Sequence, residues 1–214
     1  MIWTPVGPTV VVAPRSWDYA RLARANETGA QCPVLGIAVH PGDEGKIVAV
    51  VRRVGGTSAF RTTDDGYSWR AIADPLTRVN PQLDLSCAAV HPTLPGVVFL
   101  GARAGQRVFV SLDGGGTWPH QHDPGGQVSQ LIVDSRSAGA WDAATLYAAT
   151  NLGVAYSSNG GQSWSMAAIG EVTSLAAYTP PSGTPRFYAG VYGQGLFYAE
   201  APGGPWQNLL GTAG

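Results

Sequence analysis

The residues best suited to chemistry are scattered along the chain and do not form one catalytic motif. His120, His122 and Asp123 stand close together in the segment PHQHDPGG, and imidazole and carboxylate groups are zinc ligands. Their spacing is a weak metal signal, and we expect no metal. Asp74, Asp84 and Asp123 are carboxylates of the kind that glycoside hydrolases use in pairs, but no motif surrounds any of them.

The remaining enzyme signatures are missing from the sequence. There is no G-x-S-x-G nucleophile elbow and no glycine-rich phosphate loop, so we expect neither a cofactor nor an assignable catalytic residue. With 13 Lys and Arg against 14 Asp and Glu, the net charge is −1, which does not favour a nucleic-acid partner. No apolar run approaches the roughly 20 residues of a membrane span, and no signal peptide is visible, so the compartment is left open.

The composition favours a chain of short strands and tight turns. The 214 residues include 29 glycines and 16 prolines, and only 13% are charged while 44% are hydrophobic. This balance disfavours disorder and helical bundles and predicts an all-β protein. Cys87, within LSCAAV, is expected to pack as a small apolar side chain. His40 and His91, each within AVHP, are expected to have a structural role at the end of a strand.

A repeated segment organises the sequence. Residues 62–69, 111–118 and 157–164 all fit S/T-x-D/N-x-G-x-S/T-W. Residues 199–206 keep only the glycine and Trp206 of this motif. Apolar strand patterns separated by Gly and Pro precede each segment, giving four short strands in each period of about 46 residues, which is typical of a β-propeller blade. We therefore predict one propeller domain over residues 1–214, with blades at 33–75, 83–120, 127–168 and 171–210.

The motif has a structural explanation as the turn before the last strand of each blade. Its Asp or Asn is expected to accept hydrogen bonds from backbone N–H groups two residues on, its Gly to adopt a positive φ, and its Trp to bury its ring between sheets. The residues given this structural role are Asp64, Gly66, Trp69, Asp113, Gly115, Trp118, Asn159, Gly161, Trp164 and, in the degenerate copy, Trp206.

The three motif segments resemble the Asp-box, or bacterial neuraminidase repeat, of sialidases, sortilin-type receptors, xyloglucanases and photosystem II assembly-factor propellers. The resemblance covers about residues 33–210 and implies a β-propeller. It implies little about activity, because these families share the blade and not the chemistry. The F/Y-R-I-P motif that opens the sialidase propeller is absent from this sequence, so the arginine triad of a sialidase is not expected.

The first 32 residues permit two interpretations. Residues 9–17 resemble residues 196–206, and Trp17 continues the spacing of the motif tryptophans, so residues 1–23 are predicted to supply the outer strands of a partial fifth blade. The alternative is a short helix that begins at Ser16 and ends near Gly29. An arc of blades that does not close would expose an apolar inner strand, which invites self-association.

The loops opposite the motif turns are the predicted binding face. In an up-and-down blade, the loops between the second and third strands share this face with the connections between blades. They contain a small excess of arginine, together with aromatic and amide side chains, which suits a carboxylate-bearing ligand. The predicted ligand-binding residues are Arg53, Arg103, His122, Asn151 and Tyr192.

Three functions remain open on this basis. The first is a non-catalytic propeller that binds a protein partner or a glycan through the loop face. The second is a glycoside-hydrolase-like propeller of sialidase or xyloglucanase type, or a fragment of one. The third is an assembly or accessory subunit of a larger complex.

Overall fold

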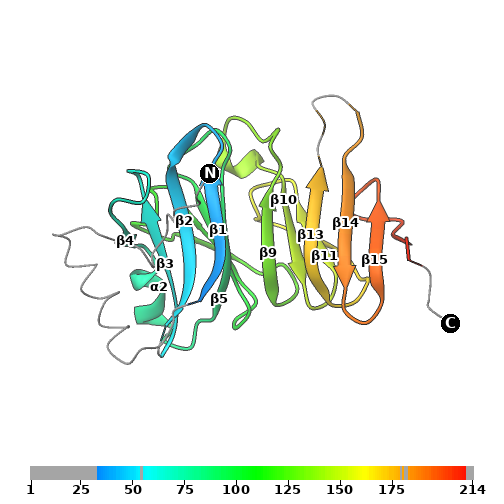
Figure 1. The fold of residues 1–214 in the computed structure, drawn as a ribbon, viewed down its shortest axis with the longest axis horizontal. Coiled ribbons are helices and arrows are strands. Elements are labelled where there is room, and N and C mark those ends of the chain that lie inside the picture. The colour runs from blue at the N-terminus through cyan, green and yellow to red at the C-terminus, as the bar shows by residue number, and fades with distance from the viewer. Residues whose placement is uncertain (1–32, 54, 179, 181–182, 211–214) are drawn as a thin grey trace, which may run out of the picture.

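The computed structural model describes residues 33–53, 55–178, 180 and 183–210. Within these residues the chain forms four sheets of four antiparallel strands, each in the order of the sequence. Figure 1 shows the sheets following one another in chain order. The predicted partial blade at residues 1–23 lies outside the described residues.

The strands follow the predicted repeat. Blade 1 contains β1 (Val34–His40), β2 (Asp43–Arg53), β3 (Gly56–Thr62) and β4 (Arg70–Ala71). Blade 2 contains β5 (Leu85–Val90), β6 (Val98–Ala102), β7 (Val108–Ser111) and β8 (His120–His122). Blade 3 contains β9 (Val128–Val133), β10 (Leu146–Thr150), β11 (Val154–Ser157) and β12 (Ser165–Ala167). Blade 4 contains β13 (Val172–Tyr178), β14 (Arg186–Val191), β15 (Gly195–Ala199) and β16 (Gln207–Asn208).

Helix is scarce in the described part of the chain, as predicted. It consists of α2 (Asp74–Val79), which connects blade 1 to blade 2, and a 3-10 turn, η1 (Trp141–Ala143), which precedes β10. Neither helix is long and apolar enough to cross a bilayer. The all-β propeller prediction is confirmed.

The core lies between consecutive blades. Each blade turns one face toward the next blade, here called its forward face, and the other toward the preceding blade, its backward face. The blade 1/blade 2 cluster includes Val50, Leu85 and Leu100, and the blade 2/blade 3 cluster includes Phe99 and Leu146. Cys87 belongs to the second of these, 5% exposed, and burial raises the pKa of its thiol to about 11, so it packs as predicted.

Each inner strand contains a bulge, and in blades 2 and 3 the bulge residue bonds to the next blade. Near the start of each inner strand, the register with the second strand slips at an equivalent residue, namely Leu35, Ser86, Ser129 and Thr173. The Ser86 hydroxyl lies 2.6 Å from the carbonyl oxygen of Val128 in blade 3, and the Ser129 hydroxyl lies 3.1 Å from that of Val172 in blade 4. Because a bulge redirects a side chain out of the regular alternation, it lets these hydroxyls bond across the blade boundary.

Candidate functional site

One position in each blade lies on the predicted binding face, beside the start of the inner strand. It is the residue after the shared register position of the second strand, occupied by Arg52, Arg103, Asn151 and Tyr192. The backbone N–H of each donates to the carbonyl of the residue directly before the inner strand of its blade, at 2.8–3.2 Å. These acceptor residues are Pro33, Asp84, Gln127 and Glu171. The four donor residues, called the loop-face quartet below, are therefore fixed at equivalent places next to the inner strands.

Charge is concentrated where blades 1 and 2 meet. The Arg52 guanidinium lies 3.6 Å from the Asp84 carboxylate, and the two side chains are 49% and 33% exposed. Arg103 is half-buried. Its backbone N–H donates to the carbonyl of Asp84 at 2.9 Å. An exposed ion pair of this kind adds little to stability. Its consequence is to hold the Arg52 guanidinium at the boundary between blades 1 and 2.

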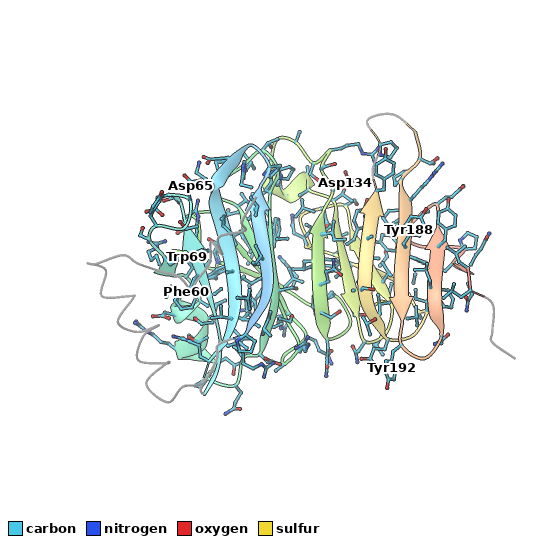
Figure 2. All side chains as sticks on the ribbon, viewed as in Figure 1. Phe60, Asp65, Trp69, Asp134, Tyr188 and Tyr192 are labelled. Carbon is cyan, nitrogen blue, oxygen red and sulfur yellow. The ribbon has the colours of Figure 1, made fainter. Side chains whose placement is uncertain are left out.

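Blades 3 and 4 contribute an amide and an aromatic ring to the quartet. The Asn151 side-chain oxygen accepts the backbone N–H of Gln127 at 2.7 Å, which fixes the orientation of the side chain. Tyr192 is 72% exposed. Figure 2 shows Tyr192 at the opposite end of the molecule from Asp65 and Asp134. Two guanidinium groups, an oriented amide and an exposed ring thus share one face.

Two of the predicted ligand-binding residues are placed elsewhere. Arg53 lies with its guanidinium carbon 5.6 Å from the centre of the Phe60 ring, a residue that packs with Trp69 on the backward face of blade 1. His122 lies on β8, the outermost strand of blade 2, with a buried Nε2 that has no hydrogen-bond partner among the described residues. Burial lowers the pKa of His122. The structure groups Arg103, Asn151 and Tyr192, and adds Arg52 in place of Arg53.

The sequence contained the signal for Arg52. Aligning the second strands by their buried residues places Val51, Ala102, Thr150 and Val191 at one position, and the following residue is then Arg52, not Arg53. Arg52 and Arg53 are adjacent on β2, and the apolar strand pattern does not show which of them lies next to the inner strand.

The motif turns lie at the other end of the blades. The N–H of the residue after the motif Asp or Asn donates to a carbonyl near the start of the second strand in three blades, from Asp65 to Gly45, Gly114 to Gly96 and Gly160 to Ala144. His40 and His91 cap the same end, each accepting a backbone N–H at Nδ1. The motif turns and the loop-face quartet therefore lie at opposite ends of the blades, as the repeat predicted.

The hydrogen bonds within the motif turns are nearly identical in the three copies. In the second copy, the Ser111 hydroxyl donates to Asp113 and accepts the Gly115 N–H at 2.7 Å. The Asp113 carboxylate accepts both the backbone N–H and the hydroxyl of Thr117, at 2.9 and 2.8 Å. The N–H group that reaches the carboxylate is thus four residues on, not two as the sequence suggested, because the first hydroxyl occupies the nearer N–H groups.

The third copy makes the same contacts with an amide. Asn159 accepts the Ser163 N–H at 2.9 Å through Oδ1 and donates to its hydroxyl through Nδ2, also at 2.9 Å. The turn therefore requires an acceptor at the side-chain oxygen that receives the backbone N–H. The second side-chain atom, which meets the hydroxyl, can be either a donor or an acceptor. The natural asparagine provides a template for testing the charge of Asp113.

Asp113 is expected to make folding stability depend on acid pH. The Thr117 N–H, followed by the hydroxyls of Ser111 and Thr117, lowers the pKa of Asp113 from 3.8 to about 2, against an opposing effect of burial. A carboxyl group with a lowered folded-state pKa stabilises the fold above its unfolded pKa, and this contribution is lost as pH falls from near 4 toward 2.

Asp113→Asn tests this dependence. In urea unfolding at pH 5, 3 and 2, the free energy of unfolding of the wild type should fall more steeply than that of the variant. Asp64, whose pKa is also lowered by the hydrogen bonds of its motif turn, chiefly those from Ser68, should leave a residual slope in both proteins. Parallel pH profiles would show that the Asp113 carboxylate is not held as the structure describes.

The described residues contain no arrangement of three or more His, Cys, Asp or Glu side chains able to hold a metal ion. His120 stacks on Trp141 with ring centres 4.4 Å apart, which occupies one face of its imidazole. The loop-face quartet instead presents the hydrogen-bond donors and positive charge of two arginines and the stacking surface of Tyr192.

Comparison with known proteins shows the fold and no family. No family model matches, and no curated protein matches by sequence. Among solved structures, the GH74 enzyme of Niastella koreensis superposes with a TM-score of 0.59 at 19% identity, over 82% of this chain and 30% of that one. YCF48 from Cyanidioschyzon merolae gives 0.58 at 16% identity, over 82% and 56%. Kuenenia stuttgartiensis hydrazine synthase gives 0.58 at 12% identity, over 79% and 47%.

These similarities define the class of protein as an all-β propeller. The chain spans less than two thirds of each of these structures. At such identities the likeness concerns the fold alone.

Proposed function

We propose that the chain is a non-catalytic propeller module of the Asp-box type that binds a carboxylate-bearing protein or glycan at its loop face. The observation that carries this proposal is the loop-face quartet. Four blades place Arg52, Arg103, Asn151 and Tyr192 at one equivalent position, each fixed by a backbone hydrogen bond. Because the backbone at these positions is constrained in the same way, the side chains are free to differ and to determine specificity.

The side chains of the quartet suit an anionic, hydroxylated or amide-bearing ligand. Guanidinium groups match carboxylates with two parallel hydrogen bonds. The exposed Tyr192 ring offers a stacking face with a polar tip. Asp84 keeps Arg52 over the boundary between blades 1 and 2, so a ligand carboxylate would compete with Asp84 for a group that is already positioned.

Binding to the quartet should depend on salt and on the two arginines. The experiment is isothermal titration of the purified chain with two probes, an oligogalacturonate and a glutamate-rich peptide, at low and high ionic strength. The proposal expects binding of one probe that weakens as salt rises, since screening reduces charge attraction. The neutral probes, an oligoglucoside and a glutamine-rich peptide, should not bind. Failure of both acidic probes, or equal binding of acidic and neutral ones, would count against the proposal.

A hydrolase is the second candidate, favoured by the likeness to GH74 enzymes. Of the carboxylates singled out for this role, Asp84 is paired with Arg52 and Asp123 accepts the N–H of Gly125 at 2.7 Å within its own turn. A turnover assay on aryl glycosides separates the candidates, because a binding module should release no aryl alcohol. An accessory subunit of a larger complex would use the same quartet and would be captured with its partners from the native source.

A further inference from the structure

The forward face of blade 4 repeats a surface that is covered everywhere else in the described chain. In blade 3, Tyr147 and Tyr156 are paired across β10 and β11. Tyr147 is 3% exposed and meets the Phe187 ring of blade 4 edge-on, with ring centres 4.8 Å apart. Tyr188 and Tyr198 are paired in the same register across β14 and β15 of blade 4. The two faces are therefore built alike.

Blade 4 leaves this tyrosine surface accessible. The Tyr188 and Tyr198 rings lie 5.3 Å apart and are half-buried, and Tyr178 beside them is 59% exposed. Figure 2 shows Tyr188 on the opposite side of the molecule from Phe60 and Trp69 of blade 1. Adjacent tyrosines on a sheet face bury a large apolar area when a second surface covers them.

The row of bulge hydroxyls also stops at blade 4. Ser86 and Ser129 each lie within hydrogen-bond distance of one carbonyl in their own blade and one in the next. Thr173, the equivalent residue of blade 4, is exposed and donates to Gly190 of its own blade. Both the rings and the hydroxyl thus mark this face as one that another surface can cover.

The backward face of blade 1 does not offer that surface. Phe60 and Trp69 on this face are 1% and 6% exposed, and Ala49, which pairs with Phe60 from the neighbouring strand β2, is fully buried. A second copy docking head to tail would need this face free. The buried blade 1 face therefore disfavours head-to-tail stacking, whereas a contact that uses the blade 4 face of both copies is the isologous arrangement most common in homodimers.

Opposite charges at the rim of the face favour such a contact. Arg186 begins β14 and lies near Tyr198, while Glu200 follows β15 and accepts the Tyr198 hydroxyl at 3.2 Å. Both residues lie at the end of blade 4 that carries the motif turns. A two-fold axis parallel to the strands places β14 of one copy over β15 of the other. Arg186 of each copy then faces Glu200 of the other copy, and Tyr188 of each copy faces Tyr198 of the other.

We propose that the blade 4 forward face is a homodimer interface, in which two copies pack their Tyr188 and Tyr198 rings together and pair Arg186 with Glu200 across a two-fold axis. The side chains that define this surface are Tyr178, Arg186, Tyr188, Leu196, Tyr198 and Glu200. The proposal concerns a surface separate from the loop-face quartet, so either can fail without the other.

Charge reversal tests the interface in the full chain. Sedimentation equilibrium over a range of concentrations should show a species of twice the chain mass. Arg186→Glu and Glu200→Arg should each weaken dimerisation by about tenfold or more, because like charges then face each other. The double variant should return the dissociation constant to within about threefold of the wild type, since both pairs are restored in reverse. Arg70→Glu, an exposed reversal on blade 1, is the control and should leave dimerisation unchanged.

Three results would overturn the proposal. A wild-type chain that stays monomeric at all concentrations has no such interface. Assemblies that keep growing beyond the dimer indicate head-to-tail association. Failure of the double variant to recover, in a protein that keeps its wild-type melting temperature, removes the pairing of Arg186 with Glu200.

Discussion

Trp118→Ala is expected to lower the free energy of unfolding by about 3 kcal/mol, the low end of the range for removing a large aromatic side chain from a core, because Trp118 is partly buried. Trp118 packs against the cluster between blades 1 and 2. Its indole N–H donates to the carbonyl of Ile72, which belongs to the connection between these blades, at 2.8 Å. The substitution therefore removes packing and also leaves a carbonyl without its donor.

Trp206→Ala is the matched comparison. Trp206 is half-buried, as Trp118 is, but its indole N–H donates to the carbonyl of Pro202 within its own degenerate motif turn, at 3.2 Å. Its loss should cost less than that of Trp118, as measured by urea unfolding of both variants. Equal costs, or a cost below about 1 kcal/mol at Trp118, would mean that the motif tryptophans do not join the blades.

Gly115→Ala is the second large effect that we expect, at about 2–4 kcal/mol, from a strained backbone and an overpacked core together. Gly115 has a φ of 91°. A Cβ atom at this position would lie 2.4 Å from the Cβ of Ile72, which cannot be relieved by rotating a flexible chain end. The clash would push apart the turn and the connection between blades 1 and 2.

Gly105→Ala separates the two contributions. Gly105 has a similar φ of 85°, but the nearest atom to its added Cβ is 3.8 Å away. This variant should show only the backbone cost of about 1–2 kcal/mol. If both glycine variants lose the same stability in thermal unfolding, the contact of Gly115 with Ile72 does not limit the motif turn.

The blade could be predicted from the sequence because the residues that repeat with its period have local roles in turns and strands. The motif glycines and tryptophans fix where each turn and last strand fall, and the apolar runs between them leave space for three more strands. The bulges were not predictable, since Leu35, Ser86, Ser129 and Thr173 share no side-chain type. Their common property is a slip in register, which arises from pairing with the second strand.

The candidate site was predictable only in part for the same reason. Arg103, Asn151 and Tyr192 follow short strands that end where their apolar pattern ends. The β2 strand runs through two consecutive arginines, Arg52 and Arg53, and alternation along a strand sends them to opposite sides. Which of them meets Asp84 depends on the packing of blade 1 against blade 2. His122 is expected in a loop from its sequence but lies on the short outer strand β8, because three residues are too few for a strand pattern to show.

The most direct test of the binding proposal compares the loop face with the motif turns in one titration. The double variant Arg52→Ala/Arg103→Ala and the single variant Asp113→Ala are titrated with the acidic probe that binds the wild type, and their melting temperatures are recorded. The loop-face variant should lose affinity and keep its melting temperature, because its side chains are largely at the surface. Asp113→Ala should bind normally while folded and melt at a lower temperature, because it loses the hydrogen bonds of its turn. Loss of binding in folded Asp113→Ala, with unchanged binding in the double variant, would place the binding site at the motif turns and contradict the proposal.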